Sequence, residues 1–320
     1  MFKWLILFLI IGFVIFSFYY CNNKELEVDN RELKTESKEP EVEKIDSVVS
    51  VDSSVSVKSI DSNISVAKKP AKIDMEMLDV GQGLAFLIQA PKCAVMYDTG
   101  TPKSGIDTML VNRKITRLCS VILSHWHDDH AGGLPVLAKM VKDKKLKINR
   151  LLVSHDYHLK NKLRDSVVAE FERLNIPIYE RHRGDTIGDF APFTASVLWS
   201  DKNDSSVTAN SASMVVHLSG GKKSFLFTGD LESKQETALL ALEPNLKVYA
   251  LQVGHHGSRH SSSAQFLAQL KPQKAYISAG KANRYKHPHK ETLERLNAII
   301  PDSNIFRTDI HGGVKFEMGF

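Results

Sequence analysis

The chain carries the stretch Ser124-His125-Trp126-His127-Asp128-Asp129-His130 directly after the apolar run Val121-Ile122-Leu123. This stretch decides the fold, because it places three imidazoles and two carboxylates directly after a predicted buried strand. Imidazole and carboxylate without thiolate suit zinc, and they also accept manganese or iron. We expect His125 and His127 to face one ion, and Asp129 and His130 to face a second ion close by. A His-rich surface loop is the alternative interpretation, and the matching segments downstream argue against it.

Two further predicted strands end in polar side chains in the same way. The apolar run Phe225-Leu226-Phe227 leads to Thr228-Gly229-Asp230, where the glycine permits close approach and the carboxylate can bridge two cations. The run Leu251-Gln252-Val253 leads to Gly254-His255-His256, of which one imidazole can complete the second metal site. Considered alone, Asp230 is better interpreted as the N-cap of a helix that begins near Glu232. Considered alone, the histidine pair is better interpreted as not binding a metal.

The amino-terminal residues predict a membrane segment. Residues 4–20 are uncharged, follow Lys3 and precede an acid-rich stretch, and a run of this length is near the lower limit for a membrane helix. The charges favour a cytoplasmic amino terminus with the rest of the chain outside the cytoplasm. We therefore predict that residues 1–21 form an uncleaved signal anchor. A cleaved signal peptide fits less well because Ser17-Phe18-Tyr19-Tyr20 is a poor small-residue cleavage site. A lipoprotein modified at Cys21 also fits less well, because the bulky Tyr20 precedes that cysteine.

Composition separates a linker from a folded domain. Residues 22–72 mix charges of both signs with repeated Ser-Val pairs, which predicts a flexible linker. Residues 73–320 should form the folded domain, and their 32 Lys and Arg against 26 Asp and Glu give a net charge of +6, which suits an anionic substrate. The three cysteines are too few and too widely spaced for a disulfide framework or a thiolate zinc site. We expect Cys93 and Cys119 to be small core residues.

Hydrophobic periodicity predicts strands that first follow one another and then alternate with helices. The expected strands cover residues 75–80, 84–89, 94–97, 118–124, 151–154, 176–179, 194–199, 213–218, 224–228, 248–253, 275–278 and 304–318. The expected helices cover residues 106–114, 134–141, 162–174, 232–242, 263–270 and 290–299. An α+β fold with two packed sheets and helices outside would satisfy this order.

Seven segments together resemble a metallo-β-lactamase-fold hydrolase. They are Leu78-Asp79-Val80-Gly81-Gln82-Gly83, Asp98-Thr99-Gly100, residues 124–133, Asn210-Ser211-Ala212-Ser213, Thr228-Gly229-Asp230, His255-His256-Gly257-Ser258 and His287-Pro288-His289. Within that superfamily the chain is similar to the carboxy-terminal, nuclease-like domain of ComEC-type DNA-internalisation proteins. The resemblance covers residues 73–320 and implies an αββα sandwich with a dinuclear metal site at one edge.

The resemblance also implies a ligand set for two divalent ions, zinc or manganese. One ion would be held by His125 and His127, the second by Asp129, His130 and His255, with Asp230 between them. His255 is preferred to His256 because it directly follows the strand and the glycine, and both stay candidates. Asp98 would orient the metal loop through a hydrogen bond.

The chain departs from many members of the superfamily, which have another histidine ligand between the metal loop and the bridging aspartate. Here that region offers Asn210-Ser211-Ala212-Ser213, as in ComEC-type domains, and His155, His158, His182 and His217 do not match the motif. The first metal would therefore be under-ligated, weakly bound, or held only together with substrate.

The implied chemistry is metal-assisted hydrolysis of a phosphodiester. The expected catalytic residues are Asp129, His256 and His287, with His256, His287 and His289 as candidates for stabilising charge on the phosphoryl oxygens. The expected substrate-binding residues are Asn210, Ser213, Ser258, Asn283, Tyr285, Lys286 and His289. Two basic stretches can follow a nucleic-acid backbone, one formed by Lys139, Lys142, Lys144, Lys145, Lys147 and Arg150, the other by Lys281, Arg284, Lys286 and Lys290.

Three functions compete on this evidence. The first is a membrane-tethered DNase outside the cytoplasm that acts in DNA uptake, binds single- or double-stranded DNA without sequence preference, and works beside a separate channel protein. The second is a hydrolase of a small ester, thioester or β-lactam, because a fold does not settle its substrate. The third is a non-catalytic DNA-binding module, which the intact metal motif argues against.

Overall fold

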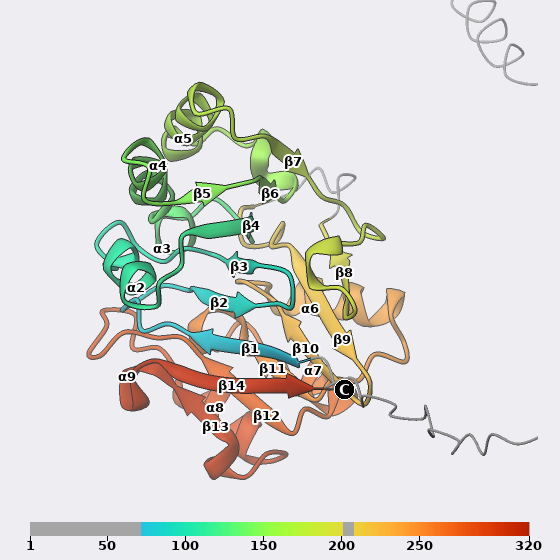
Figure 1. Ribbon diagram of the computed structural model, residues 1–320. Coiled ribbons are helices and arrows are strands. Elements are labelled where there is room, and N and C mark those ends of the chain that lie inside the picture. Colours follow the sequence, from blue (N-terminus) through green and yellow to red (C-terminus); the bar gives the residue numbers. More distant parts are fainter. Residues whose placement is uncertain (1–71, 201–207, 320) are drawn as a thin grey trace, which may run out of the picture. The chain divides into compact units, whose positions relative to one another are not determined.

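Two β-sheets lie face to face, and helices cover their outer surfaces (Figure 1). The computed structural model describes residues 72–200 and 208–319. The arrangement confirms the expected α+β fold with two sheets and outer helices. The predicted anchor (residues 1–21), Cys21 and all of the predicted linker except Lys72 lie outside the described residues.

The first sheet contains β1 (Lys72–Met77), β2 (Phe86–Gln89), β3 (Ala94–Tyr97), β4 (Arg117–Ile122), β5 (Lys147–Ile148), β6 (Leu151–Val153), β7 (Ile178–Glu180) and β14 (Val314–Gly319). Its order is β14-β1-β2-β3-β4-β6-β7, and β5 pairs with β4. The second sheet contains β8 (Thr194–Trp199), β9 (Val215–Gly220), β10 (Lys223–Phe227), β11 (Ala250–Gln252), β12 (Lys274–Ile277) and β13 (Ile305–Arg307), in the order β13-β12-β11-β10-β9-β8.

The α-helices are α2 (Ile106–Asn112), α3 (Asp128–Ala131), α4 (Leu134–Lys142), α5 (Lys162–Arg173), α6 (Ser233–Leu242), α7 (Ala264–Leu270), α8 (Lys290–Asn297) and α9 (Thr308–His311). Short 3-10 turns are η1 (His155–His158), η2 (Gly188–Phe190), η3 (Gly254–Gly257) and η4 (Asp302–Asn304). The stretch 304–318, expected as strands, contains α9, so that expectation was partly wrong. None of the helices in the described ranges is long and apolar enough to cross a membrane.

Three apolar clusters separate the layers. One lies between the first sheet and α2, α4 and α5, and another lies between the second sheet and α6, α7 and α8. The middle cluster joins the two sheets, with Phe86 of β2 against Phe225 of β10 at a ring-centroid distance of 5.6 Å. Alternate residues of β2 face different clusters, because Phe86 and Ile88 point to the middle one and Leu87 to the outer one. The strand is therefore buried on both faces, which explains its continuous apolar sequence.

Parallel pairing brings the chemically active strand ends together. In the first sheet β3, β4, β6 and β7 run parallel, so the residues after them share one sheet edge. In the second sheet β10, β11 and β12 also run parallel. The segment after β4 carries the metal loop, and the segments after β10 and β11 carry Asp230 and the histidine pair. A site built at the facing edges therefore draws ligands from both sheets.

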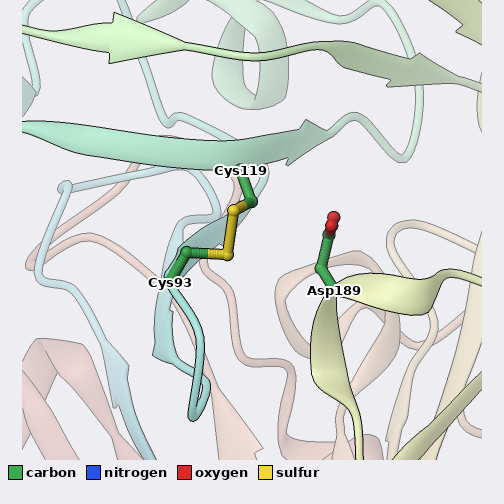
Figure 2. Close-up of side chains that lie close together, drawn as sticks. All are labelled: Cys93, Cys119 and Asp189. Atoms are coloured by element: carbon green, nitrogen blue, oxygen red, sulfur yellow. A yellow bond between two sulfur atoms is a disulfide. The ribbon is translucent and has the colours of Figure 1, made fainter.

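Cys93 and Cys119 form a disulfide, so the expectation of two unpaired core residues was wrong (Figure 2). Cys93 precedes β3 and Cys119 lies in β4, which are paired parallel neighbours. This pairing brings their Cα atoms to 5.9 Å, within the range that a disulfide spans. A separation of 26 residues in sequence did not reveal it, because only the strand pairing places the two residues side by side.

Candidate metal centre

The metal loop is held by one buried carboxylate from the neighbouring strand. Asp98 follows β3, and its Oδ1 accepts a hydrogen bond from Ser124 N at 2.7 Å while its Oδ2 accepts one from Ser124 Oγ at 2.7 Å. The same Oδ2 lies 2.8 Å from His130 Nδ1. This contact leaves His130 Nε2 directed toward the cluster, which is the orienting role that the resemblance implies for Asp98.

Asp230 reaches the loop because Gly229 allows the second sheet to come close. Gly229 has a φ of +54°, and a Cβ at this position would lie 2.7 Å from Cβ of Ser124. The backbone N–H groups of Thr228 and Gly229 both donate to Gln252 Oε1, at 2.7 and 2.8 Å, which fixes the turn after β10. Helix α6 has Glu232 as its N-cap, so the alternative interpretation of Asp230 as a cap was wrong.

Asp230 lies at the centre of the candidate ligands. Its Oδ1 is 3.1 Å from His130 Nε2 and 3.7 Å from His256 Nε2. Its Oδ2 is 4.0 Å from His125 Nε2 and 3.7 Å from His255 Nε2. A carboxylate with one oxygen toward each side of the cluster has the arrangement that a bridging ligand needs.

Two overlapping sets of side chains can each hold an ion. The first set is His125, His130 and Asp230, and the second is Asp129, His130 and His256; within each set the ligand atoms lie within 4.8 Å of one another. His127, the remaining predicted ligand of the metal loop, places its Nδ1 3.1 Å from His125 Nε2. The structure therefore brings all four predicted ligands of the metal loop to one point beside Asp230.

The structure favours His256 over His255 as the ligand from the second sheet. His256 is buried, its Nδ1 lies 2.9 Å from the carbonyl oxygen of Ser278, and its Nε2 lies 3.3 Å from Asp129 Oδ2. A hydrogen bond from Nδ1 to that carbonyl leaves the Nε2 lone pair for a metal. His255 instead lies between Asp230 and Glu232, with 3.7 Å to a carboxylate oxygen of each.

Three buried atoms of this centre fit a bound cation. His130 Nε2, Asp230 Oδ1 and His256 Nε2 face one another across 3.1 to 3.7 Å without a well-aligned hydrogen bond within the described residues. Unpaired buried polar atoms are costly unless a ligand satisfies them. Burial opposes ionisation of Asp230, yet the neighbouring His130 and His256 hold its pKa well below the usual range. Burial also opposes charge on these two histidines, but Asp230 outweighs it and raises the pKa of both, so a metal ion would displace their protons and take over their charge. Burial also holds the pKa of His125 well below its usual range, so this imidazole is neutral, as a ligand must be.

A cavity of about 920 Å³ opens onto the cluster. Six of the predicted catalytic or substrate-binding residues line it, namely Asp129, Asn210, His256, Asn283, Tyr285 and His287, together with His127, Asp230 and His255 of the cluster. Sequence reasoning did not assign Trp126, Asn161, Gln82 or Asp128 to it, although all four line it. Trp126 and Asp128 stood inside the metal loop, whereas nothing in the sequence marked Asn161 before the fold placed it there.

The other predicted substrate-binding residues lie outside the cavity lining. Ser213 is fully buried, and its Oγ accepts the Asp230 N–H at 3.1 Å, so it positions a ligand. Ser258 is also buried, and its carbonyl accepts from Thr292 at 2.9 Å. His289 is the N-cap of α8, and its Nδ1 accepts from Arg259 N at 3.1 Å. Lys286 is exposed and does not line the cavity.

The rim of the cavity is basic and aromatic. The guanidinium carbon of Arg284 lies 4.7 Å from the centre of the Tyr285 ring, and Tyr285 is 45% exposed. Lys281 and Arg284 line the same cavity. The Tyr285 ring stacks on His287 at 5.7 Å. Burial, helped by the nearby His256, lowers the pKa of His287 to about 4, so this imidazole is a neutral hydrogen-bonding group at pH 7.

A sequence model described as the metallo-beta-lactamase superfamily matches residues 78–281. "ComE operon protein 3" of Bacillus subtilis (strain 168) is 32% identical over 263 residues, which are 76% of this chain and 33% of the relative. "Competence protein ComA" of Neisseria gonorrhoeae is 30% identical over 245 residues, which are 75% of this chain and 32% of the relative. Both are ComEC-type competence proteins, which confirms the resemblance. The chain spans about a third of the length of these curated relatives.

Solved structures show the same fold. The metallo-beta-lactamase fold protein YhfI from Bacillus subtilis superposes with a TM-score of 0.52 at 13% identity, over 77% of this chain and 100% of that one. At this identity the likeness concerns the fold alone.

Proposed function

The chain belongs to the metallo-beta-lactamase superfamily, and from this premise we propose that it is a phosphodiesterase that cleaves DNA outside the cytoplasm during DNA uptake. The fold implies that it binds divalent metal, and we propose zinc or manganese at His125, His127, Asp129, His130, Asp230 and His256. His255 remains close enough to Asp230 to contribute.

One observation carries the choice of substrate: the cavity joins the ligand cluster to a rim with two cationic side chains and an exposed aromatic ring. Asp129, Asp230 and His256 form one part of its lining, and Lys281, Arg284 and Tyr285 form another. Cations beside a single strand neutralise its phosphates, and a flat aromatic ring stacks on bases of any sequence. This combination suits DNA bound without sequence preference.

The residues of the chain prepare the site for hydrolysis. Two divalent cations held by these residues would supply Lewis acidity and would make hydroxide available near neutral pH. Asp98 keeps His130 turned toward the cluster, and Ser213 holds the backbone of Asp230. Burial opposes ionisation of Asp129, but the contact with His256 outweighs it and lowers the pKa of Asp129, so this carboxylate can accept a hydrogen bond from the attacking water. His287, being neutral, can donate a hydrogen bond to a phosphoryl oxygen.

Two observations support a location outside the cytoplasm and a role in DNA uptake. The Cys93–Cys119 disulfide is of a kind that persists in oxidising compartments and is rare in the cytosol. The curated relatives include a protein named for competence. We propose that residues 1–21 anchor the chain in the membrane as an uncleaved signal anchor, ahead of a lipoprotein modified at Cys21. A separate channel protein would then receive the DNA.

Cleavage of labelled DNA tests the proposal. The full chain in detergent would be incubated with single- and double-stranded DNA in Mn²⁺ or Zn²⁺, beside an Asp129→Ala/His130→Ala variant. We expect metal-dependent cleavage that this variant loses. Cleavage that survives in the variant would indicate a contaminating nuclease. A metal-loaded, folded protein that cleaves neither form of DNA would overturn the proposal.

A matched pair of variants tests the rim. Arg284→Ala/Tyr285→Ala should weaken DNA cleavage while hydrolysis of bis(p-nitrophenyl) phosphate continues. Lys223→Ala/Tyr249→Ala removes another pair of one cationic and one aromatic side chain, 5.2 Å apart, neither of which lines the cavity, and should leave both activities near the wild-type level. Equal losses in both pairs would show that general charge, and not the rim, binds the DNA.

A small-molecule hydrolase is the second candidate. The cavity volume of about 920 Å³ lies within the range of small-ligand sites. In that case the protein would hydrolyse ester, thioester or β-lactam substrates but not DNA. The Arg284→Ala/Tyr285→Ala variant would then show no DNA cleavage to lose.

A further inference from the structure

A second group of metal-ligand side chains lies apart from the candidate metal centre. His155 and His158 lie in η1 after β6, and Glu180 is the last residue of β7. His155 Nδ1 is 2.9 Å from Glu180 Oε1, and His158 Nε2 is 2.9 Å from Glu180 Oε2. None of the three lines the cavity described above.

A fourth side chain completes the group. His182 follows β7, and its Nε2 lies 3.8 Å from Glu180 Oε1. Its Nδ1 is buried and makes no hydrogen bond within the described ranges. The centres of the His155 and His182 rings are 6.4 Å apart.

The spacing suits a small tetrahedral ion. The ligand atoms of His155, His158 and Glu180 all lie within 4.8 Å of one another. Donor atoms about 2.0–2.1 Å from a tetrahedral zinc ion are separated from each other by roughly 3.3 Å. Three imidazoles and one carboxylate are typical zinc donors. Zinc binding would replace the two His–Glu hydrogen bonds with metal bonds, and the distances between the donor atoms would change little.

We propose that His155, His158, Glu180 and His182 form a zinc site, separate from the metal centre, that holds η1 against β7. Asp156 lies between the two histidines of η1, and its Oδ2 accepts a hydrogen bond from Trp126 N at 2.6 Å. Trp126 stands in the metal loop between His125 and His127. An ion at Glu180 therefore stabilises the turn that supports the metal loop, and it needs no contact with substrate.

Zinc stoichiometry tests the site. The full chain would be equilibrated with Zn²⁺, dialysed, and assayed for bound metal, together with a His155→Ala/His158→Ala variant and a His311→Ala control on α9. The same three proteins would be compared in the Asp129→Ala/His130→Ala background, which weakens the metal centre. We expect the pair of substitutions to remove one zinc per chain in both backgrounds, whereas His311→Ala removes none. Equal zinc content in all three proteins would overturn the proposal.

A conservative variant guards against a simple folding defect. Glu180→Gln keeps the volume of the side chain and removes its charge. Loss of a residue that hydrogen-bonds to a metal ligand lowers metal affinity by roughly 10- to 100-fold. Loss of the ligand Glu180 itself should lower the affinity for this zinc by more than that. Titration with Zn²⁺ against a competing chelator measures this change. Unchanged affinity in a folded Glu180→Gln protein would show that Glu180 is not a zinc ligand and would overturn the proposed site.

Cobalt distinguishes the geometry. Co²⁺ replaces zinc in such sites and absorbs visible light when it is tetrahedral. In the Asp129→Ala/His130→Ala background, the absorption should disappear after His155→Ala/His158→Ala. A visible spectrum that this pair does not change would place the metal elsewhere and overturn the assignment.

Discussion

The metal centre and the Glu180 cluster both collect histidines and carboxylates at the ends of parallel strands, but they differ in burial and support. His125 and His130 are 0% exposed, whereas the side chain of His158 is 59% exposed. In the metal centre, Asp98 and the Ser278 carbonyl orient ligands from behind. In the Glu180 cluster, the ring nitrogens of His155 and His158 have Glu180 as their only hydrogen-bond partner among the described residues.

The difference indicates that ligand chemistry alone does not make a catalytic site. The metal centre draws ligands from the segments that follow strands of both sheets, and the cavity that opens onto it gives a substrate access. The Glu180 cluster comes from the first sheet and its following turns. Preorganised ligands inside a cavity suit catalysis, and a half-exposed cluster at a sheet edge suits a structural ion.

The largest expected effect comes from Asp230, because it touches both ligand sets. Asp230→Ala should lower hydrolysis by at least about 1,000-fold, more than loss of one hydrogen-bond donor at an active site usually costs. Initial rates and bound metal would be measured together, with Asp230→Asn as a control for packing. An Asp230→Ala protein with a tenth of normal activity would contradict the central position of this residue.

Comparison of His256→Ala with His255→Ala sharpens the ligand set. We expect the His256 variant to lose metal affinity by about 100-fold or more, and the His255 variant by less than about 10-fold. The reason is that the Ser278 carbonyl orients His256 toward Asp129. Zinc titration of each variant measures the ratio, and a reversed order would restore His255 as the ligand.

Asp98→Asn should have an intermediate effect. The amide oxygen is a weaker acceptor for the His130 Nδ1–H group than the carboxylate, and the amide turns an N–H group toward one of the present donors. Metal affinity should fall by about 10- to 100-fold. Asp189→Asn is a matched control, because Asp189 also accepts hydrogen bonds at the first sheet but contacts Ser120 and Arg150 away from the centre.

His287 should change the rate without changing its dependence on pH. Its lowered pKa, about 4, means that it binds a proton only in more acidic solution and stays neutral from pH 5 to pH 8. A His287→Asn variant should therefore be slower by the same factor throughout this range. Parallel pH–rate profiles would agree with this expectation. An inflection near pH 6.5 that disappears with the side chain would contradict it.

The smallest effect is expected for Glu180→Gln in metal-free protein. Its ion pairs are partly exposed, so their loss should lower the free energy of unfolding by about 1 kcal/mol or less. Urea unfolding at pH 7 in the presence of a chelator measures it. With zinc present, the difference between wild type and variant should grow. An equal difference in the free energy of unfolding with and without zinc would show that no zinc ion stabilises the Glu180 cluster.

Sequence periodicity predicted the order of most strands and helices, because a side chain that faces a core repeats with the period of its element. The ligands of the metal loop were recognisable for a similar reason, since they are neighbours in the chain. The short helix α9 was missed, because four residues are too few to show a helical period. Asn161 was missed because it reaches the cavity only through the fold.

The sequence by itself therefore determined the succession of elements, the superfamily and the ligands contributed by one loop. Only the tertiary structure decided which histidine of the pair after β11 faces Asp129, that Cys93 meets Cys119, and that η1 meets Glu180. The physical reason is that these contacts join segments far apart in the chain. Their geometry depends on strand pairing and on backbone turns, such as the positive φ angles of His255 and His256, which no local pattern specifies.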